Sequence, residues 1–169
     1  ASSMASLVDS NPNLIVGRTF SKVHGLAGLR IGYAIANPVT IDLLSNFHIG
    51  RGMTISSASA NAAIACLKDA EFEAYSRRKI IEGREMVCKA FDNLGIEYMP
   101  SAANFVFFRN DKFYMDPVEA MEKENILVRD YDYFPGWTRV SIGTIEEMEA
   151  FNAATIRCLK VKNIKDLKE

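Results

Sequence analysis

A single lysine, Lys22, lies at a position where its amine could bind or react with a ligand. It follows an apolar run and precedes a loop whose glycines lead to an arginine, in RTFSKVHGLAGLRIGYAIA, residues 18–36. The β-branched cluster before it predicts a buried strand of an α/β sheet over residues 14–19. Because open α/β sheets bind ligands beyond their strand ends, a lysine here would point inward, partly desolvated, toward a ligand. A solvated surface lysine is the alternative that this segment alone leaves open.

A second strand is predicted over residues 29–36, after the glycine-containing loop. If this strand pairs antiparallel with the strand at 14–19, the loop between them returns Arg30 close to Ser21 and Lys22. The sequence therefore predicts that a guanidinium, a hydroxyl and an amine meet at one end of a hairpin.

The next elements are helical. Asn37 as N-cap and Pro38 at the first helical position predict a helix that ends near Phe47. A loop rich in glycine and serine is expected over residues 48–59, and a buried helix over 60–69.

A long helical pattern covers residues 70–95 and ends at Gly95. Gly83 within it costs about 1 kcal/mol relative to alanine, and a bend is expected there. The composition changes after this helix, so the domain boundary is placed inside it, which gives domains at 1–85 and 86–169. The first domain shows only two strands and little crossover structure, as expected for part of a larger domain.

The second half of the chain alternates strands and helices, as in an α/β unit. The predicted elements are strands at 103–109, 126–129 and 138–143 and a helix at 116–125. Thr144 and Glu147 then form the T-x-x-E capping box of a final amphipathic helix.

Composition excludes several classes of function. With 20 basic and 21 acidic residues in 169, the net charge of −1 gives no electrostatic footprint for nucleic acid or an anionic membrane. Cys66, Cys88 and Cys158 are widely spaced, which argues against a disulfide framework or a zinc site, and no metal site is expected. No apolar run suits a membrane span or a signal peptide, so a cytoplasmic protein with small-molecule ligands is predicted.

The segment TFSKVHGLAGLRIGY resembles the lysine segment of fold-type I pyridoxal-phosphate aminotransferases. It is most similar to the histidinol-phosphate aminotransferase branch, whose pattern is S-K-x-x-G-L-A-G-L-R-x-G-Y. PSAANFVFFR and ILVRDYDYFPGWTRVSIGTIEEMEAF resemble two later segments of that branch, in the same order. The resemblance implies an α/β fold, in which 1–85 is the C-terminal part of the cofactor-binding large domain with its mixed sheet and 86–169 is the small C-terminal α/β domain.

The resemblance also implies roles for the residues around Lys22. Lys22 would form the internal aldimine with pyridoxal 5'-phosphate and then move the proton between the substrate's alpha carbon and cofactor C4′. Ser21 and Arg30 match ligands of the cofactor phosphate, and Thr19 could add a hydroxyl. The alternative is that Ser21 caps a turn and Arg30 makes a structural ion pair. His24 is expected to be a packing residue.

Arg139 matches the arginine that binds the substrate's acidic group in this superfamily. In the histidinol-phosphate branch, Arg129 and Arg139 are both expected to face the substrate phosphate, although a surface ion pair is an equal alternative for Arg129. Asn104 and Phe105 belong to the resemblance, but the segment ANFVFF, residues 103–108, is better explained as core strand than as ligand. A loop packing near the site entrance, without catalytic groups, is expected for Tyr131, Tyr133, Phe134 and Trp137.

In such enzymes, several residues upstream of the lysine contact the cofactor, among them an aspartate that pairs with the pyridine nitrogen. No residue of this sequence can be matched to them. The chain is therefore expected to be the C-terminal half of an aminotransferase, inactive alone, whose other half supplies those groups. A homodimer using an amino donor and a 2-oxo acid is implied. The alternatives are a threonine-phosphate-type decarboxylase and a non-catalytic module.

Overall fold

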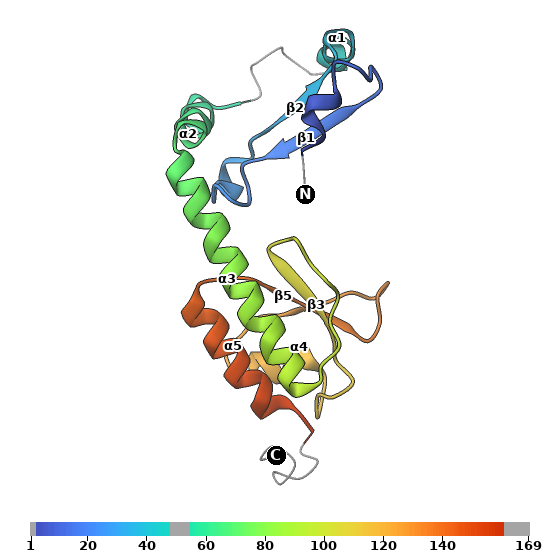
Figure 1. Cartoon of the computed structure of the whole chain (residues 1–169), viewed down its shortest axis with the longest axis vertical. Helices are drawn as coiled ribbons and strands as arrows, with labels where there is room; N and C mark the ends of the chain where they lie inside the picture. The colour runs from blue at the N-terminus through green and yellow to red at the C-terminus, as the bar shows by residue number, and fades with distance from the viewer. Residues whose placement is uncertain (1–2, 48–54, 161–169) are drawn as a thin grey trace. The chain divides into compact units, whose positions relative to one another are not determined.

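The computed structural model describes residues 3–47 and 55–160. The chain divides into two compact units, residues 1–76 and 77–169, and the division lies within the long helix α3 (Figure 1). The elements in chain order are β1 (Ile15–Thr19), β2 (Gly32–Ala36), α1 (Pro38–Phe47), α2 (Ser57–Lys68), α3 (Ala70–Leu94), β3 (Phe105–Arg109), α4 (Pro117–Glu122), β4 (Arg129–Asp130), β5 (Trp137–Ser141) and α5 (Ile145–Cys158), with short 3₁₀ turns at Met4–Leu7 and Ala27–Leu29. The assignment of 1–85 and 86–169 to two enzyme domains remains a prediction.

In the first unit, β1 and β2 form the predicted antiparallel hairpin, with Thr19 opposite Gly32 at its loop end. The expected buried strand is wrong, because β1 is largely solvent-exposed and 48% of Ile15 is accessible. Apolar strand residues become buried only where a second layer covers them, and the described residues of this unit place no such layer over β1.

The capping signals of the first unit are confirmed where the structure describes them. The Asn37 Oδ1 accepts a hydrogen bond of 3.0 Å from the Val39 backbone N–H, and α1 begins at Pro38. Residues 48–54 of the loop expected at 48–59 lie outside the described residues. The last residues of that expected loop belong to α2. The expected burial of that helix is wrong, because only Ser59 and Ala63 are buried in it.

Helix α3 runs without interruption from Ala70 through Gly83 to Leu94, and the bend expected at Gly83 stays a prediction. Gly83 is buried because its helix packs closely against another segment: a Cβ at this position would lie 2.9 Å from Ile142 Cγ2. Gly95, with φ of 61°, ends the helix in the left-handed conformation, as predicted.

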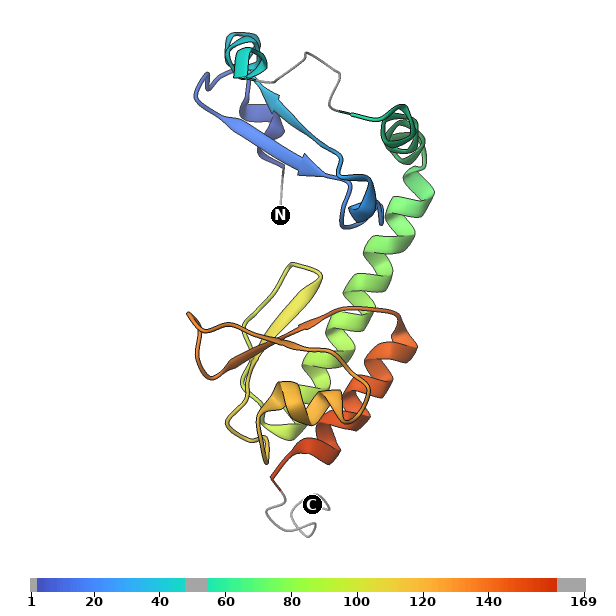
Figure 2. The ribbon, with the colours of Figure 1, turned by 180° about the vertical axis from the view of Figure 1, so that it is seen from behind.

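The second unit is a three-stranded antiparallel sheet in the order β3-β5-β4. Helices α3 and α5 lie side by side along one face of it (Figures 1 and 2). Phe91 of α3 contacts Phe108 and Phe151 at ring-centroid distances of 5.0 and 6.0 Å, and all three are fully buried. This face is therefore the core, and the other face of the sheet carries half-buried aromatic residues and arginines.

Two elements of the second unit are shorter than predicted. Helix α4 ends at Glu122, because Asn125 takes a left-handed conformation with φ of 60° and the Ile126 N–H returns to the Met121 carbonyl. These cap contacts occupy the start of the strand expected at 126–129, so β4 contains only Arg129 and Asp130.

The capping box of α5 is confirmed. The Glu147 N–H donates to Thr144 Oγ1, and the Glu147 carboxylate accepts from the Thr144 N–H at 2.7 Å. Among residues 3–47 and 55–160, no helix combines the length and apolar character needed to cross a membrane.

Candidate active site

The loop that carries Lys22 is anchored at both ends. Phe20 and Ile31, which flank it, are buried and pack against Ala63 of α2. The Phe20 N–H donates to the Ile31 carbonyl at 3.3 Å, which extends the hairpin by one step beyond Thr19. The Ser59 hydroxyl of α2 donates to the Leu29 carbonyl at 3.0 Å, so α2 holds this loop through apolar and polar contacts.

Within the loop, Ser21 and Lys22 follow the anchor Phe20 directly. The Ser21 N–H donates to Thr19 Oγ1 at 3.1 Å, and the Gly25 N–H donates to the Lys22 carbonyl at 2.9 Å. Gly25 has φ of 69°, a conformation that favours glycine in this tight turn. The Lys22 side chain is exposed, so the expected desolvation is not provided by the described residues of this unit.

Arg30 precedes the second anchor, Ile31, and adopts the left-handed conformation with φ of 48°. Its Nη1 donates to the Ala27 carbonyl at 2.9 Å. Its guanidinium makes no ion pair with any acidic side chain that the structure describes, so the alternative of a structural ion pair gains no support. His24 packs its ring against Phe20 at 5.2 Å, as expected of a packing residue.

The two candidate substrate arginines are direct neighbours across strands of the second unit. Arg129 of β4 lies opposite Arg139 of β5 in the ladder. Both guanidiniums lie over the ring of Tyr131, at 4.9 Å for Arg129 and 5.8 Å for Arg139. Arg139 also lies over Phe105 at 5.3 Å. The sheet thus brings two like charges together on its open face.

Neither arginine is neutralised by a neighbour that the structure describes. No acidic side chain of residues 3–47 and 55–160 forms an ion pair with Arg129 or Arg139, so the surface ion pair considered for Arg129 gains no support. The Nε of Arg139 is enclosed and has no hydrogen-bond partner there. An unsatisfied buried donor costs about 1–3 kcal/mol, which an anion at this place would recover.

Asp130, beside Arg129 in the sequence, belongs to the other face of the sheet. It pairs in the ladder with the fully buried Thr138. Burial raises the pKa of the Asp130 carboxyl above its ordinary value, and a hydrogen bond with the Thr138 side chain opposes this rise. Asp130 is half-buried on that face, so its carboxylate is directed away from the two guanidiniums of the open face.

The sequence profile of the family described as aminotransferase class I and II matches residues 1–154. The chain belongs to this family. Histidinol-phosphate aminotransferase 1 of Cupriavidus pinatubonensis is 40% identical to this chain over 154 residues, which are 88% of the chain and 40% of that protein. The chain thus spans about two fifths of the length of this curated relative.

Solved structures show the same fold. A protein from Erwinia carotovora atroseptica, assigned to the histidinol-phosphate aminotransferases, superposes with a TM-score of 0.84 at 32% identity and covers 93% of this chain and 45% of its own. Histidinol-phosphate aminotransferase from Sinorhizobium meliloti, in complex with pyridoxal-5'-phosphate, gives 0.71 at 29% identity, with coverage of 85% and 40%. The expectation of an α/β aminotransferase fold is confirmed.

For an aminotransferase, the hairpin offers groups that suit a phosphorylated carbonyl cofactor. It presents an exposed primary amine on Lys22, hydroxyls on Thr19 and Ser21, and on Arg30 a guanidinium without an acidic partner among the described residues. A cationic fork and hydroxyls are what a phosphate requires, and an amine is what an aldehyde requires. The donor set fits pyridoxal phosphate.

The predicted site residues therefore fall into two groups. The four candidate cofactor residues lie at the loop end of the hairpin in the first unit, and the two arginines face each other in the sheet of the second unit. Tyr131 was assigned to an entrance loop, and its contact with both guanidiniums was missed. Its position two residues after Arg129, directly past the end of β4, was the available signal, because a chain that stays extended returns residue i+2 to the side of residue i.

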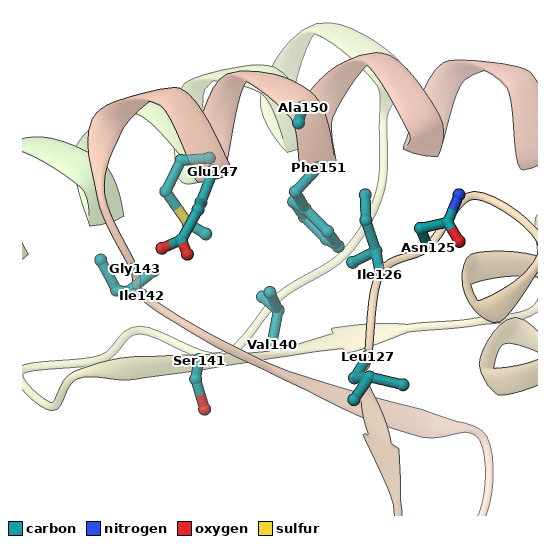
Figure 3. Close-up of a pocket in the computed structure, with 11 residues that line it drawn as sticks. Asn125, Ile126, Leu127, Val140, Ser141, Ile142, Gly143, Glu147, Ala150 and Phe151 are labelled. Carbon is teal, nitrogen blue, oxygen red and sulfur yellow. The ribbon is translucent and has the colours of Figure 1, made fainter.

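A separate pocket of about 360 Å³ lies in the second unit on the α5 side of the sheet. Figure 3 shows Phe151 and Glu147 of α5 on one side of it and Val140 and Leu127 on the other. None of the six candidate site residues of the aminotransferase lines this pocket. The Glu147 carboxylate there already serves the capping box of α5.

Proposed function

We propose that the full-length protein containing this chain is a pyridoxal-phosphate-dependent aminotransferase that exchanges an amino group between histidinol phosphate and 2-oxoglutarate. Family membership supports the class of reaction. The observation that supports a phosphorylated amino donor is the pairing of Arg129 with Arg139 on the open face of the sheet, without an acidic neighbour among the described residues. Other amino acids as donors are outcomes of the test below.

The hairpin residues have separate tasks in this proposal. Pyridoxal phosphate, when bound, supplies an electron sink for the substrate's alpha carbon. Arg30, Ser21 and Thr19 hold its phosphate through charge-assisted and hydroxyl hydrogen bonds. Lys22 supplies the amine that holds the cofactor, and its Nζ accepts the proton that leaves the substrate's alpha carbon. Groups that contact the cofactor ring come from outside this chain.

The arginine pair suits a phosphate because both guanidiniums remain charged. Like charges directly opposite each other destabilise a sheet, and an anion between the two guanidiniums would relieve this repulsion. A phosphate dianion can accept hydrogen bonds from both guanidiniums, including the free Nε–H of Arg139. An alpha-carboxylate needs only one of them.

The test is kcat/KM of the full-length enzyme with Arg129→Ala and Arg139→Ala. With histidinol phosphate as donor and 2-oxoglutarate as acceptor, each substitution should raise the barrier by about 2–4 kcal/mol, since a charge-assisted contact to phosphate is lost. Phenylalanine as donor should depend mainly on Arg139.

Arg109 provides the matched control for this experiment. It lies on the same open face, over the Trp137 ring at 5.5 Å, but its Nε is 4.0 Å from the Glu97 carboxylate. Arg109→Ala should therefore leave kcat/KM for histidinol phosphate within a factor of about three, the size expected of a surface pair. Unchanged turnover in Arg129→Ala would remove that residue from the site and favour aromatic amino acids as donors.

We also propose that the full-length enzyme is a cytoplasmic homodimer. Large apolar side chains of the first unit are exposed in this chain, among them Phe47 at 85% and Val39 at 68%. Exposed apolar surfaces of this kind favour burial in a contact with another protein segment or subunit. Light scattering of the full-length enzyme should give twice the subunit mass, and a monomer at micromolar concentration would contradict the proposal.

A further inference from the structure

We propose that Tyr131 is a positioning residue that holds Arg129 and Arg139 together while leaving both guanidiniums free for a doubly charged anion. The inference rests on the proposed function and identifies what determines the charge of the group bound there. Tyr131 would act through the two arginines, with its ring taking the place that a carboxylate would otherwise occupy.

The geometry places the Tyr131 ring against both cations. Arg129 and Arg139 face each other across the β4–β5 ladder, and their guanidinium carbons lie 4.9 and 5.8 Å from the centre of this one ring. The ring is itself fixed by packing. Its centroid lies 5.8 Å from that of Phe107 and 5.2 Å from that of Tyr133. Phe107 is directly opposite Arg139 on the neighbouring strand, so a residue of the sheet itself packs against the Tyr131 ring.

The electrostatics explain why a ring is suitable here. Two guanidiniums side by side repel each other, and a carboxylate between them would relieve the repulsion. That carboxylate would also occupy their N–H donors and repel an anionic ligand. The negative face of an aromatic ring attracts both cations but carries no net charge and accepts no strong hydrogen bond. The pair therefore keeps its full charge and its donors.

The third arginine of the same face shows the contrasting arrangement. Arg109 lies over Trp137 and is also within 4.0 Å of Glu97. Within the part of the chain that the structure describes, Arg129 and Arg139 have ring contacts but no such acidic partner. The distinction predicts that, of the three arginines on this face, Arg129 and Arg139 bind an anion strongly and Arg109 does not.

The experiment measures the competitive inhibition constant of inorganic phosphate on the full-length enzyme, with phenylalanine as amino donor. Tyr131→Leu and Tyr131→Gln, which lack the ring, should raise this constant about 5- to 30-fold, as expected for two lost cation–π contacts. Tyr131→Phe should recover most of the affinity, because the ring face remains. With histidinol phosphate as donor, the ring-less variants should raise KM more than they lower kcat.

Tyr114 provides the matched control, because it is an exposed tyrosine of the same unit, 50% accessible, and the described rings that contact Tyr131 are those of Phe107 and Tyr133. Tyr114→Leu should leave the inhibition constant unchanged within a factor of about two. Near-ultraviolet circular dichroism of each variant checks that the fold is kept, and if Tyr131→Leu does not fold, the polar Tyr131→Gln carries the test.

The outcomes separate this inference from the proposed function. If Arg139→Ala weakens phosphate inhibition but neither ring-less variant does, the role of Tyr131 is refuted and the arginine site stands. If Tyr131→Phe loses as much affinity as Tyr131→Leu, the hydroxyl rather than the ring is responsible, and the inference is also refuted. If Arg139→Ala leaves phosphate inhibition unchanged, the phosphate site itself is wrong.

Discussion

Alanine at Gly83 brings two opposing effects into one experiment. In an exposed helix, alanine is favoured over glycine by about 1 kcal/mol because it restricts the unfolded backbone. At Gly83, however, the new Cβ would lie 2.9 Å from Ile142 Cγ2 and 3.4 Å from Met148 Cγ. Ile142 is buried and β-branched, so rotation about its χ1 angle is restricted and its Cγ2 methyl cannot easily move away from the new Cβ.

The expected magnitude follows from these contacts. Inserting one methyl group into a packed interior costs about 1–3 kcal/mol. Subtracting the helix-propensity gain of about 1 kcal/mol leaves a net loss of up to about 2 kcal/mol for Gly83→Ala. Lys89, exposed on the same helix, supplies the reference: the difference in stability between Lys89→Ala and Lys89→Gly measures propensity without packing.

Urea unfolding of this chain measures the change in its free energy of unfolding. The fluorescence of its single tryptophan, Trp137, which lies in β5 of the second unit, monitors the transition. The penalty should shrink when Gly83→Ala is combined with Ile142→Ala, since the obstructing methyl is then absent. If Gly83→Ala stabilises the chain as much as alanine does at Lys89, the close-packing explanation of this glycine is refuted.

Two further predictions concern the second unit. The pKa of Asp130 is raised in the folded state. Between the ordinary carboxyl pKa and this raised pKa, the folded chain therefore binds more protons than the unfolded chain, and its free energy of unfolding falls as the pH rises through that interval. Asp130→Asn should therefore gain in Tm relative to the unsubstituted chain between about pH 3 and pH 7, and a constant difference would contradict the burial argument. Thr144→Ala removes the capping box of α5 and should lower the free energy of unfolding by about 1 kcal/mol in the Trp137 assay, whereas no change would show that the cap is dispensable.

Local signals in the sequence predicted three helix termini correctly, those at Pro38, Gly95 and Thr144. Asn37 with Pro38, Gly95 and the Thr144 capping box each act within one turn of the chain, so their effect is visible without knowledge of the fold. Burial was predicted poorly for β1 and α2. Whether an apolar side chain is buried depends on what covers it, and that partner is distant in the sequence.

The same distinction applies to the candidate site. The placement of Ser21 and Arg30 at the loop end of one hairpin followed from antiparallel pairing of neighbouring strands, which the sequence could predict. The adjacency of Arg129 and Arg139 could not be derived from their spacing alone, because it depends on the strand order β3-β5-β4. The role of Gly83 required the position of Ile142, which only the packed structure provides.

The most direct test of the central claim is the identity of the lysine that holds the cofactor in the full-length enzyme. Reduction with borohydride in the presence of pyridoxal phosphate, followed by peptide mass spectrometry, should place the cofactor on Lys22. The near-visible absorbance band of the bound cofactor should disappear in Lys22→Ala and persist in Lys68→Ala, a matched change at an exposed lysine of α2. A reduced adduct on any other lysine, or an unchanged band in Lys22→Ala, would contradict the account.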